Sequence, residues 1–357
     1  MRTRRNASIA AGVAASAVAA GLVGRALVRR HHEHRVAAES PWELPPEDLG
    51  LVSSFDGTGI AVRAAGDPEA PVILFVHGFS LDMTTWLEQW RDLSIDFRCV
   101  LMDQRSHGRS ERAAHGDLSL RAMGRDIAAV LNVVASGRPA LVVGHSMGGM
   151  AILAMAEQRP ELFGPQVGGV AFIGTASSGL LRRAMGSVTG LLRPRLDTLT
   201  AAAQRVDRLR KAVLASPADL SGAVARLTQF GPDASRDVVD HVVGLAQRTS
   251  SEVWTDGLAE LMEMDLRHAI PRVRVPALVV VGEYDRVTPP AAAVALAGEL
   301  PQGRLVVIEG AGHMPMLERP HELNLEIRAF ARELAGPAES RRKPRRRPRP
   351  RAEETAR

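Results

Sequence analysis

The stretch from Leu141 to Met150 constrains the fold of this chain more than any other. An apolar, mostly β-branched run, Leu141-Val142-Val143, leads into Gly144-His145-Ser146-Met147-Gly148-Gly149, and a helix-forming run over 150–157 follows at once. This order predicts a strand, a sharp turn and a helix, with Ser146 at the turn. A serine hydroxyl that projects from such a turn is a candidate nucleophile.

The glycines around Ser146 support this interpretation. Gly144 and Gly148 stand two residues before and two residues after the serine, and they lack the Cβ atoms that would clash at a strained turn. Gly149 allows the following helix to lie close against the sheet. The N-terminus of that helix then brings backbone N–H groups and a positive dipole end towards Ser146.

Apolar strands alternate with helices along the chain. After a linker at 41–46, residues 51–55 and 60–63 predict a β-hairpin around a turn at 56–59. Further strands are expected at 72–76, 97–102, 140–144, 167–173, 277–281 and 304–308, and helices at 83–93, 118–135 and 147–159. Because continuous apolar strands alternate with helices, we expect an α/β fold with a doubly wound, mostly parallel sheet of eight strands.

The strand pattern stops between Thr175 and about Met262. The segment carries Leu, Val and Ala at helical spacing together with many arginines. We expect residues 176–262 to form a helical insertion that acts as a lid over Ser146, because the carboxyl ends of the flanking strands face the site. Its apolar side chains either line a substrate channel or form the insertion's own core. The candidate lining residues are Leu180, Met185 and Leu191.

A base and an acid for Ser146 follow later in the chain. An alcohol is a poor nucleophile at neutral pH, so Ser146 needs a base, and His313 follows the flexible turn Gly310-Ala311-Gly312. A carboxylate must hold the other ring nitrogen of His313 and stabilise the imidazolium. Asp285, which follows the strand at 277–281, is the preferred candidate, and Glu283 is the alternative.

With these motifs in this order, the chain from about residue 51 to 335 resembles the lidded serine esterases and lipases of the α/β-hydrolase fold. The motifs that carry the resemblance are His77-Gly78-Phe79, Asp103–Ser110, Gly144–Gly149, Gly282–Pro289 and Gly310–His313. It implies two core parts, 41–175 and 263–335, on either side of the insertion. It also implies that Ser146, Asp285 and His313 form a catalytic triad.

The resemblance further implies an oxyanion hole made by the backbone N–H groups of Phe79 and Met147. The residues expected to support the turn and the loop are His77, Gly78, Gly144, His145, Gly148 and Gly149. We expect His77 to order its loop and His145 to pack beside the nucleophile. Arg105 and His107 are expected to stabilise their own turn.

Serine at residue 146 argues against relatives of haloalkane dehalogenases and epoxide hydrolases, which place aspartate there. Epoxide hydrolases of this family also use tyrosines of the insertion, whereas the one tyrosine of this chain, Tyr284, lies outside it. Hydrolysis of a small-molecule carboxylic ester through an acyl-enzyme remains as the expected reaction. Perhydrolases and haloperoxidase-like enzymes, thioesterases, C–C hydrolases and acyltransferases stay open as alternatives, as does a non-catalytic receptor or scaffold. With no metal-ligand spacing or phosphate-binding loop, we expect no metal and no cofactor.

The net charge of +5 is concentrated at the two ends of the chain. Residues 1–35 and 336–357 each carry +6, so the remainder carries −7. This mildly acidic body gives no reason to expect nucleic-acid binding. We expect the Arg- and Pro-rich tail at 336–357 to be disordered. Its role is either that of a solvated tail or adhesion to an anionic membrane surface.

The N-terminal segment 1–40 contains an uncharged run at 7–24 that is flanked by arginines on both sides. Its length reaches the roughly 17–20 residues that span a bilayer, although Ala and Gly make it weakly hydrophobic. We expect a membrane anchor. A cleaved export signal with Ala15-Ser16-Ala17 at its cleavage site, and a soluble cytoplasmic protein, are the alternatives.

Overall fold

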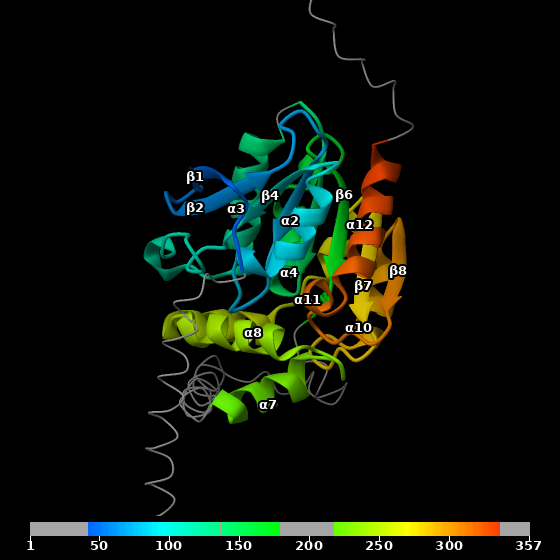
Figure 1. Cartoon of the computed structure of the whole chain (residues 1–357). Helices are drawn as coiled ribbons and strands as arrows, with labels where there is room; N and C mark the ends of the chain where they lie inside the picture. The colour runs from blue at the N-terminus through cyan, green and yellow to red at the C-terminus, as the bar shows by residue number, and fades with distance from the viewer. Residues whose placement is uncertain (1–41, 136, 179–217, 336–357) are drawn as a thin grey trace, which may run out of the picture.

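The computed structural model describes residues 42–135, 137–178 and 218–335, which form a sheet with helices on both faces (Figure 1). Eight strands of these ranges pair in the order β1-β2-β4-β3-β5-β6-β7-β8. They are β1 Glu47–Ser53, β2 Gly59–Ala65, β3 Val72–Val76, β4 Arg98–Met102, β5 Ala140–His145, β6 Val167–Ile173, β7 Ala277–Gly282 and β8 Gly303–Ile308. β2 pairs antiparallel with β1 and β4, and the other pairs are parallel. The predicted doubly wound, mostly parallel sheet is confirmed.

Helices cover both faces of this sheet. The α-helices of the described residues are α2 Leu87–Leu93, α3 Leu120–Val134, α4 Met147–Gln158, α7 Ala218–Gln229, α8 Arg236–Arg248, α9 Leu258–Glu263, α10 Pro290–Glu299, α11 Pro315–Glu318 and α12 Pro320–Leu334. The shorter turns are η1 Met83–Trp86, η2 Ala114–Gly116, η3 Pro160–Leu162, η5 Val253–Gly257 and η6 Arg267–Arg272. Buried residues of α3, α4 and α10 form one hydrophobic layer, and those of α2 and α12 form the other.

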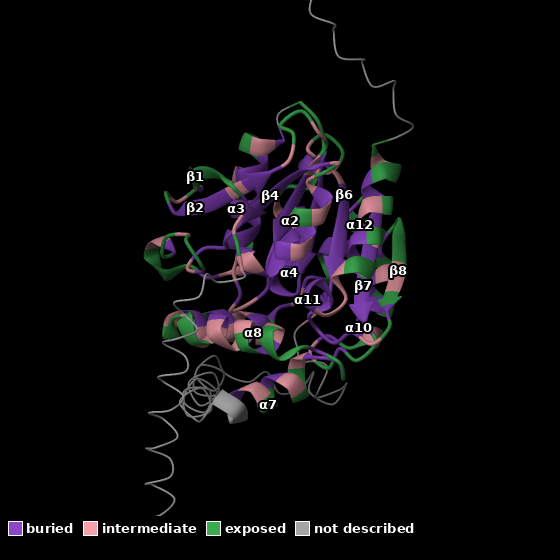
Figure 2. Ribbon diagram, in the orientation of Figure 1, coloured by how far each residue is buried: buried purple, intermediate pink, exposed green. Residues whose placement is uncertain are grey.

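Alternation along the strands separates these two layers. Val142 of β5 and Phe172 of β6 face the layer under α3 and α4, whereas Val143 and Ile173 face the layer under α2 and α12. Every residue of β5 and of β7 is buried, as continuous apolar strands predict. Figure 2 shows the central strands buried, whereas the edge strands β1 and β8 are largely exposed or intermediate. The carboxyl end of β5 therefore presents Ser146 from a rigid, fully packed strand.

The described part of the predicted insertion is helical. It consists of α7, α8, the π-helical turn η5 and α9, which follow β6 and precede β7. In Figure 1, α7 and α8 lie at the end of the sheet towards which the β7 arrow points. Leu180, Met185 and Leu191 lie outside the described residues, so their role in lining a channel stays a prediction.

Residues 42–46 pack on the body, although the sequence predicts an open linker there. Trp42 stacks on His241 of α8 with ring centroids 3.8 Å apart, and Leu44 packs against the α2–α12 layer. The linker prediction misses this contact because His241 lies far along the chain. The predictions of an anchor at 7–24 and a basic tail at 336–357 fall outside the described residues. Among the described helices, none is long and apolar enough to cross a membrane.

Candidate active site

Ser146 occupies a strained turn between β5 and α4. Its φ and ψ of 50° and −115° lie where a residue with a Cβ is rarely found, at a cost of about 1–3 kcal/mol. Surrounding hydrogen bonds hold this conformation. The N–H of Ser146 donates to the carbonyl of Ile173 at 2.9 Å, and the hydroxyl of Thr175 donates to the carbonyl of Ser146 at 2.7 Å. The turn thus projects a serine side chain from the carboxyl edge of the sheet.

The glycines of this turn are required by close backbone approaches. A Cβ at Gly144 would lie 2.6 Å from the backbone nitrogen of Gly149, and a Cβ at Gly148 would lie 2.4 Å from the carbonyl oxygen of Val76. Neither approach leaves room for a side chain, because the neighbouring atoms belong to the backbone. The tight strand-turn-helix geometry expected around Ser146 is present.

Asp285 and His313 form a buried pair at the same edge of the sheet. His313 Nδ1 lies 2.9 Å from Asp285 Oδ2, and both side chains are almost fully buried. Asp285 Oδ1 accepts the N–H groups of Val287 at 2.9 Å and Thr288 at 2.8 Å. Burial acts to raise the pKa of Asp285, but the His313 charge and these hydrogen bonds outweigh it and hold the pKa below its usual value. The carboxylate is therefore ionised, as an orienting partner for an imidazole must be.

Thr288 contacts both residues of this pair, and the sequence analysis did not identify it. Its hydroxyl donates to Asp285 Oδ2 at 2.8 Å and lies 3.3 Å from His313 Nδ1. A local signal was available, because a Thr three residues after an Asp is placed to bond that carboxylate in a turn. Glu283, the alternative acid, lies exposed, and its Oε2 accepts the N–H of Gly310 at 3.0 Å. The structure brings Asp285 to the His313 imidazole.

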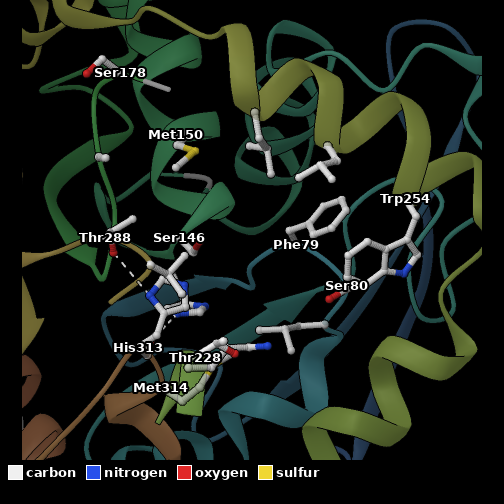
Figure 3. Close-up of a pocket in the computed structure, with 17 residues that line it drawn as sticks. Phe79, Ser80, Ser146, Met150, Ser178, Thr228, Trp254, Thr288, His313 and Met314 are labelled. Atoms are coloured by element: carbon white, nitrogen blue, oxygen red, sulfur yellow. Dashed lines mark hydrogen bonds between the residues drawn. The ribbon is translucent and has the colours of Figure 1, made fainter. Parts of the chain in front are cut away.

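A cavity of about 240 Å³ contains both Ser146 and His313 in its lining. Figure 3 shows the two side chains next to each other at one end, with Phe79 and Trp254 across the cavity. The other lining residues are Ser80, Leu81, His145, Met150, Ala176, Ser178, Thr228, Gln229, Leu258, Leu261, Val287, Thr288 and Met314. Most of these side chains are apolar or neutral. None of the described lining residues is a carboxylate, lysine or arginine.

The insertion supplies part of this wall. Thr228 and Gln229 end α7, Leu258 and Leu261 belong to α9, and Trp254 lies on the π-helical turn η5. The Trp254 ring meets the Phe79 ring edge to face, with centroids 4.9 Å apart. Such pairs contribute about 0.5–1.5 kcal/mol beyond their buried area. Trp254 was not singled out from the sequence, because nothing local indicates which aromatic side chain reaches the cavity.

The loop at His77-Gly78-Phe79 is held by a buried histidine. His77 Nδ1 donates to the carbonyl of Gly78 at 2.8 Å, and His77 Nε2 accepts the N–H of Gln104 at 3.0 Å. Burial, followed by the charge of His107, lowers the pKa of His77 to about 3, so the ring is neutral. Since the Gly78 carbonyl and the Phe79 N–H belong to one planar peptide, this bond also orients that N–H.

The loop also lies directly against the turn that carries Ser146. A Cβ at Gly78 would be 2.7 Å from His145 Nδ1 and 3.2 Å from Ser146 Cβ. Met147, the residue after Ser146, begins α4, so no preceding helical turn supplies an acceptor for its N–H. The two predicted oxyanion donors, on Phe79 and Met147, thus come from segments that touch.

Arg105 and His107 stabilise the turn after β4, as expected. The Arg105 guanidinium makes two hydrogen bonds of 2.7 Å to the buried carboxylate of Asp126. His107 Nδ1 donates to the carbonyl of Arg105 at 2.9 Å, and His107 Nε2 accepts the N–H of Ser80 at 3.3 Å. Because Ser80 lines the cavity, this turn supports the cavity from behind.

Comparison with known proteins places these observations in a family. A sequence profile described as the alpha/beta hydrolase family matches residues 73–326. The non-heme chloroperoxidase of Streptomyces lividans is 26% identical over 292 residues, which cover 80% of this chain and all of that protein. The bifunctional esterase/perhydrolase of Acinetobacter calcoaceticus is 28% identical over 288 residues, with the same coverage. A pimeloyl-[acyl-carrier protein] methyl ester esterase of Yersinia pestis is 28% identical over 75% of this chain and 95% of its own.

Solved structures share the fold. A thermophilic esterase from Thermogutta terrifontis superposes with a TM-score of 0.64 at 24% identity, over 81% of this chain and 99% of its own. A bromoperoxidase from Bacillus anthracis has the same TM-score at 17% identity, over 80% of this chain and 99% of its own.

Proposed function

This chain is an enzyme of the alpha/beta hydrolase family, and on that premise we propose that it hydrolyses carboxylic esters through an acyl-enzyme on Ser146. The observation that carries the proposal is the 2.9 Å contact between Nδ1 of His313 and the ionised Asp285, because His313 and Ser146 line the same cavity. An imidazole whose Nδ1 is held by a carboxylate has Nε2 available as a base. Relatives named as esterases support the reaction class.

The proposed reaction uses the residues in the following roles. His313 Nε2 takes the proton of the Ser146 hydroxyl as its oxygen attacks the ester carbonyl, and Asp285 stabilises the imidazolium. The N–H groups of Phe79 and Met147 stabilise the oxyanion. Removal of one such donor in another enzyme costs about 2.7–4 kcal/mol of transition-state stabilisation. His313 then protonates the leaving alcohol. Water, activated by the same imidazole, releases the acid and restores the Ser146 hydroxyl.

We propose a neutral, mainly apolar ester as the substrate class. Phe79, Met150, Trp254 and Leu258 form apolar walls, and the described lining contains no carboxylate, lysine or arginine. Burying a substrate charge in such a lining would cost several kcal/mol without a partner. A series of p-nitrophenyl esters with neutral, acidic and basic acyl groups tests this point. Equal kcat/KM for charged and neutral esters would contradict it.

A fluorophosphonate probe tests the nucleophile and separates an enzyme from a receptor on the same fold. The wild-type protein should react with one equivalent of probe at Ser146. Ser146→Ala should lose this labelling and lower ester turnover by about 10⁴-fold or more, while it stays folded. Ser53→Ala, at an exposed position at the end of β1, is the matched control. Retention of a tenth of the wild-type turnover in Ser146→Ala would refute the assignment.

Perhydrolysis is the second candidate, because relatives named as a chloroperoxidase and an esterase/perhydrolase match this chain along their whole length. In that reaction hydrogen peroxide replaces water as the acceptor of the acyl group, and a peracid leaves. Peracid formation from a p-nitrophenyl ester in the presence of hydrogen peroxide measures it. A peracid yield that exceeds the acid yield would make perhydrolysis the main activity.

A further inference from the structure

The carboxylate of Glu318 lies between the turn that carries His313 and the insertion. Its Oε1 accepts the N–H groups of Gly312 at 2.9 Å and Met314 at 3.1 Å, which are the residues on either side of His313. Its Oε2 accepts the N–H of Gly231 at 2.7 Å, in the connection between α7 and α8. One half-buried side chain therefore joins both flanks of His313 to the insertion.

A second set of contacts holds the same connection against the turn. The N–H of His313 donates to the carbonyl of Gln229 at 2.7 Å. A Cβ at Gly231 would lie 2.3 Å from the carbonyl oxygen of Gly310, and a Cβ at Gly312 would lie 2.5 Å from the nitrogen of Gly231. The two segments thus touch backbone to backbone, and a side chain at either glycine would push them apart.

The bonds to Glu318 involve a carboxylate, whereas the bond from His313 to Gln229 joins two backbone groups. Arg319 and Asp233 also pair at 3.0 Å, but this pair is largely exposed and such pairs contribute little. Burial raises the pKa of Glu318, and the N–H groups of Gly231, Gly312 and Met314 oppose the rise because they bind the ionised carboxylate. Charge-assisted bonds from three backbone donors are roughly twice as strong as neutral ones.

We infer that Glu318 is a positioning residue, which places the His313 imidazole by joining both flanks of His313 to the connection between α7 and α8. Its catalytic consequence rests on the proposed function. The insertion and the base then keep one relative position, so a loosened connection displaces His313 from Ser146. A displacement of about 1 Å in a catalytic group can cost about 100-fold in rate.

Glu318→Gln tests this role with almost no change in size. It replaces one acceptor oxygen by an NH₂ group that faces a backbone N–H, so one side of the bridge is lost. We expect kcat to fall about tenfold to a hundredfold while KM stays within about twofold, and the rate of fluorophosphonate labelling to fall with kcat. The matched control is Glu322→Gln, which changes an exposed carboxylate on α12 and should retain wild-type kcat.

Amide hydrogen exchange tests the connection without any measurement of activity. In Glu318→Gln, residues 229–233 and 310–316 should exchange faster together, by about tenfold, while β5 keeps its wild-type protection. Gly231→Ala tests the same coupling from the side of the insertion with Glu318 intact. Its Cβ would meet the carbonyl oxygen of Gly310, so we expect the same loss of kcat and the same exchange pattern.

Wild-type kcat in a folded Glu318→Gln protein, or unchanged exchange in both segments, would overturn the inference. If Glu318→Gln does not fold, Gly231→Ala decides it, and wild-type kcat and exchange in that variant would overturn it. Failure of the proposed function has a different signature. A wild-type protein that neither hydrolyses esters nor reacts with the probe would refute the ester hydrolase assignment, whereas the exchange measurement would still decide whether Glu318 joins the two segments.

Discussion

The imidazole of His145 donates a hydrogen bond from Nε2 to the backbone carbonyl of His313, at 2.9 Å. The residue before the proposed nucleophile therefore holds the backbone of the proposed base. The His145 ring is fully buried, and among the described residues its Nδ1 has no hydrogen-bond partner. Burial, followed by the charge of His313, lowers the pKa of His145 to about 3. His145 thus stays neutral, with its proton on Nε2.

His145→Phe should keep the packing of the ring but leave the His313 carbonyl without its donor. An unsatisfied buried carbonyl costs about 1–3 kcal/mol, so we expect the free energy of unfolding to fall by that amount. His145→Gln retains an N–H donor and should lose less. Urea denaturation of the two variants measures the difference. Equal losses in both would mean that the hydrogen bond to His313 does not contribute to stability.

Asp285→Asn should lower kcat by about 10⁴-fold, because the amide donates a hydrogen bond to Nδ1 and favours the wrong tautomer of His313. The protein should remain folded, since the side chain keeps its shape. Glu283→Gln is the control and should leave kcat nearly unchanged. Steady-state hydrolysis of a p-nitrophenyl ester compares the two. A larger loss in Glu283→Gln would transfer the acid role to that residue.

Three buried histidines predict a loss of stability in acid. Burial lowers the pKa of His77 and His145 to about 3 and that of His107 to about 4, from 6.5 in the unfolded chain. Between pH 6.5 and about 4 the unfolded state therefore binds more protons, so stability falls as the pH drops through this window. Asp103 acts in the opposite sense, because burial raises its pKa from 3.8 to about 7 and the native state holds the extra proton.

Each histidine contributes a slope of up to about 1.4 kcal/mol per pH unit, and the three histidines outweigh Asp103 and Glu318, whose pKa values burial raises. The free energy of unfolding, measured by urea denaturation at several pH values from about 6.5 down to 4.5, should therefore decrease. His107→Gln removes one of the three groups and should make the decrease shallower. A free energy that is constant or rises towards acid would show that these rings accept protons in the native state.

Trp254→Ala should widen the cavity at the end opposite Ser146. We expect kcat/KM for long or bulky acyl esters to rise about tenfold relative to short ones, because a removed indole frees space that a substrate can fill. Leu227→Ala, at an exposed position on α7, is the matched control and should leave the ratio unchanged. A ratio that stays flat in Trp254→Ala while the protein becomes less stable would show that Trp254 only packs the insertion.

The residues of the proposed triad were accessible from the sequence because each follows a strand with a strong local signal. β5 precedes Ser146, β7 precedes Asp285, and β8 precedes the glycine turn before His313. Parallel strands bring such positions to one edge of the sheet, so order along the chain predicts that these residues lie near one another. Thr288 also had a local signal, three residues from Asp285, and it was missed.

Other parts of the site depend on segments that meet only in the folded chain. Trp254 reaches Phe79, and Glu318 reaches Gly231, across long stretches of sequence. The stacking of Trp42 on His241, in a segment that the sequence predicts to be a linker, has the same origin. None of these contacts leaves a periodic pattern or a short motif, so the sequence contains no signal for them.

Local sequence patterns were enough to predict the alternation of strands and helices, the strained turn at Ser146 and the order in which Asp285 and His313 follow it. These features depend on side-chain periodicity and backbone sterics, which act between near neighbours. Three features emerge only from the folded chain. Asp285 rather than Glu283 meets His313, His145 is neutral and bonded to the His313 carbonyl, and Glu318 joins the insertion to the turn that carries His313. These features depend on burial and on contacts between distant segments, which arise when the whole chain packs.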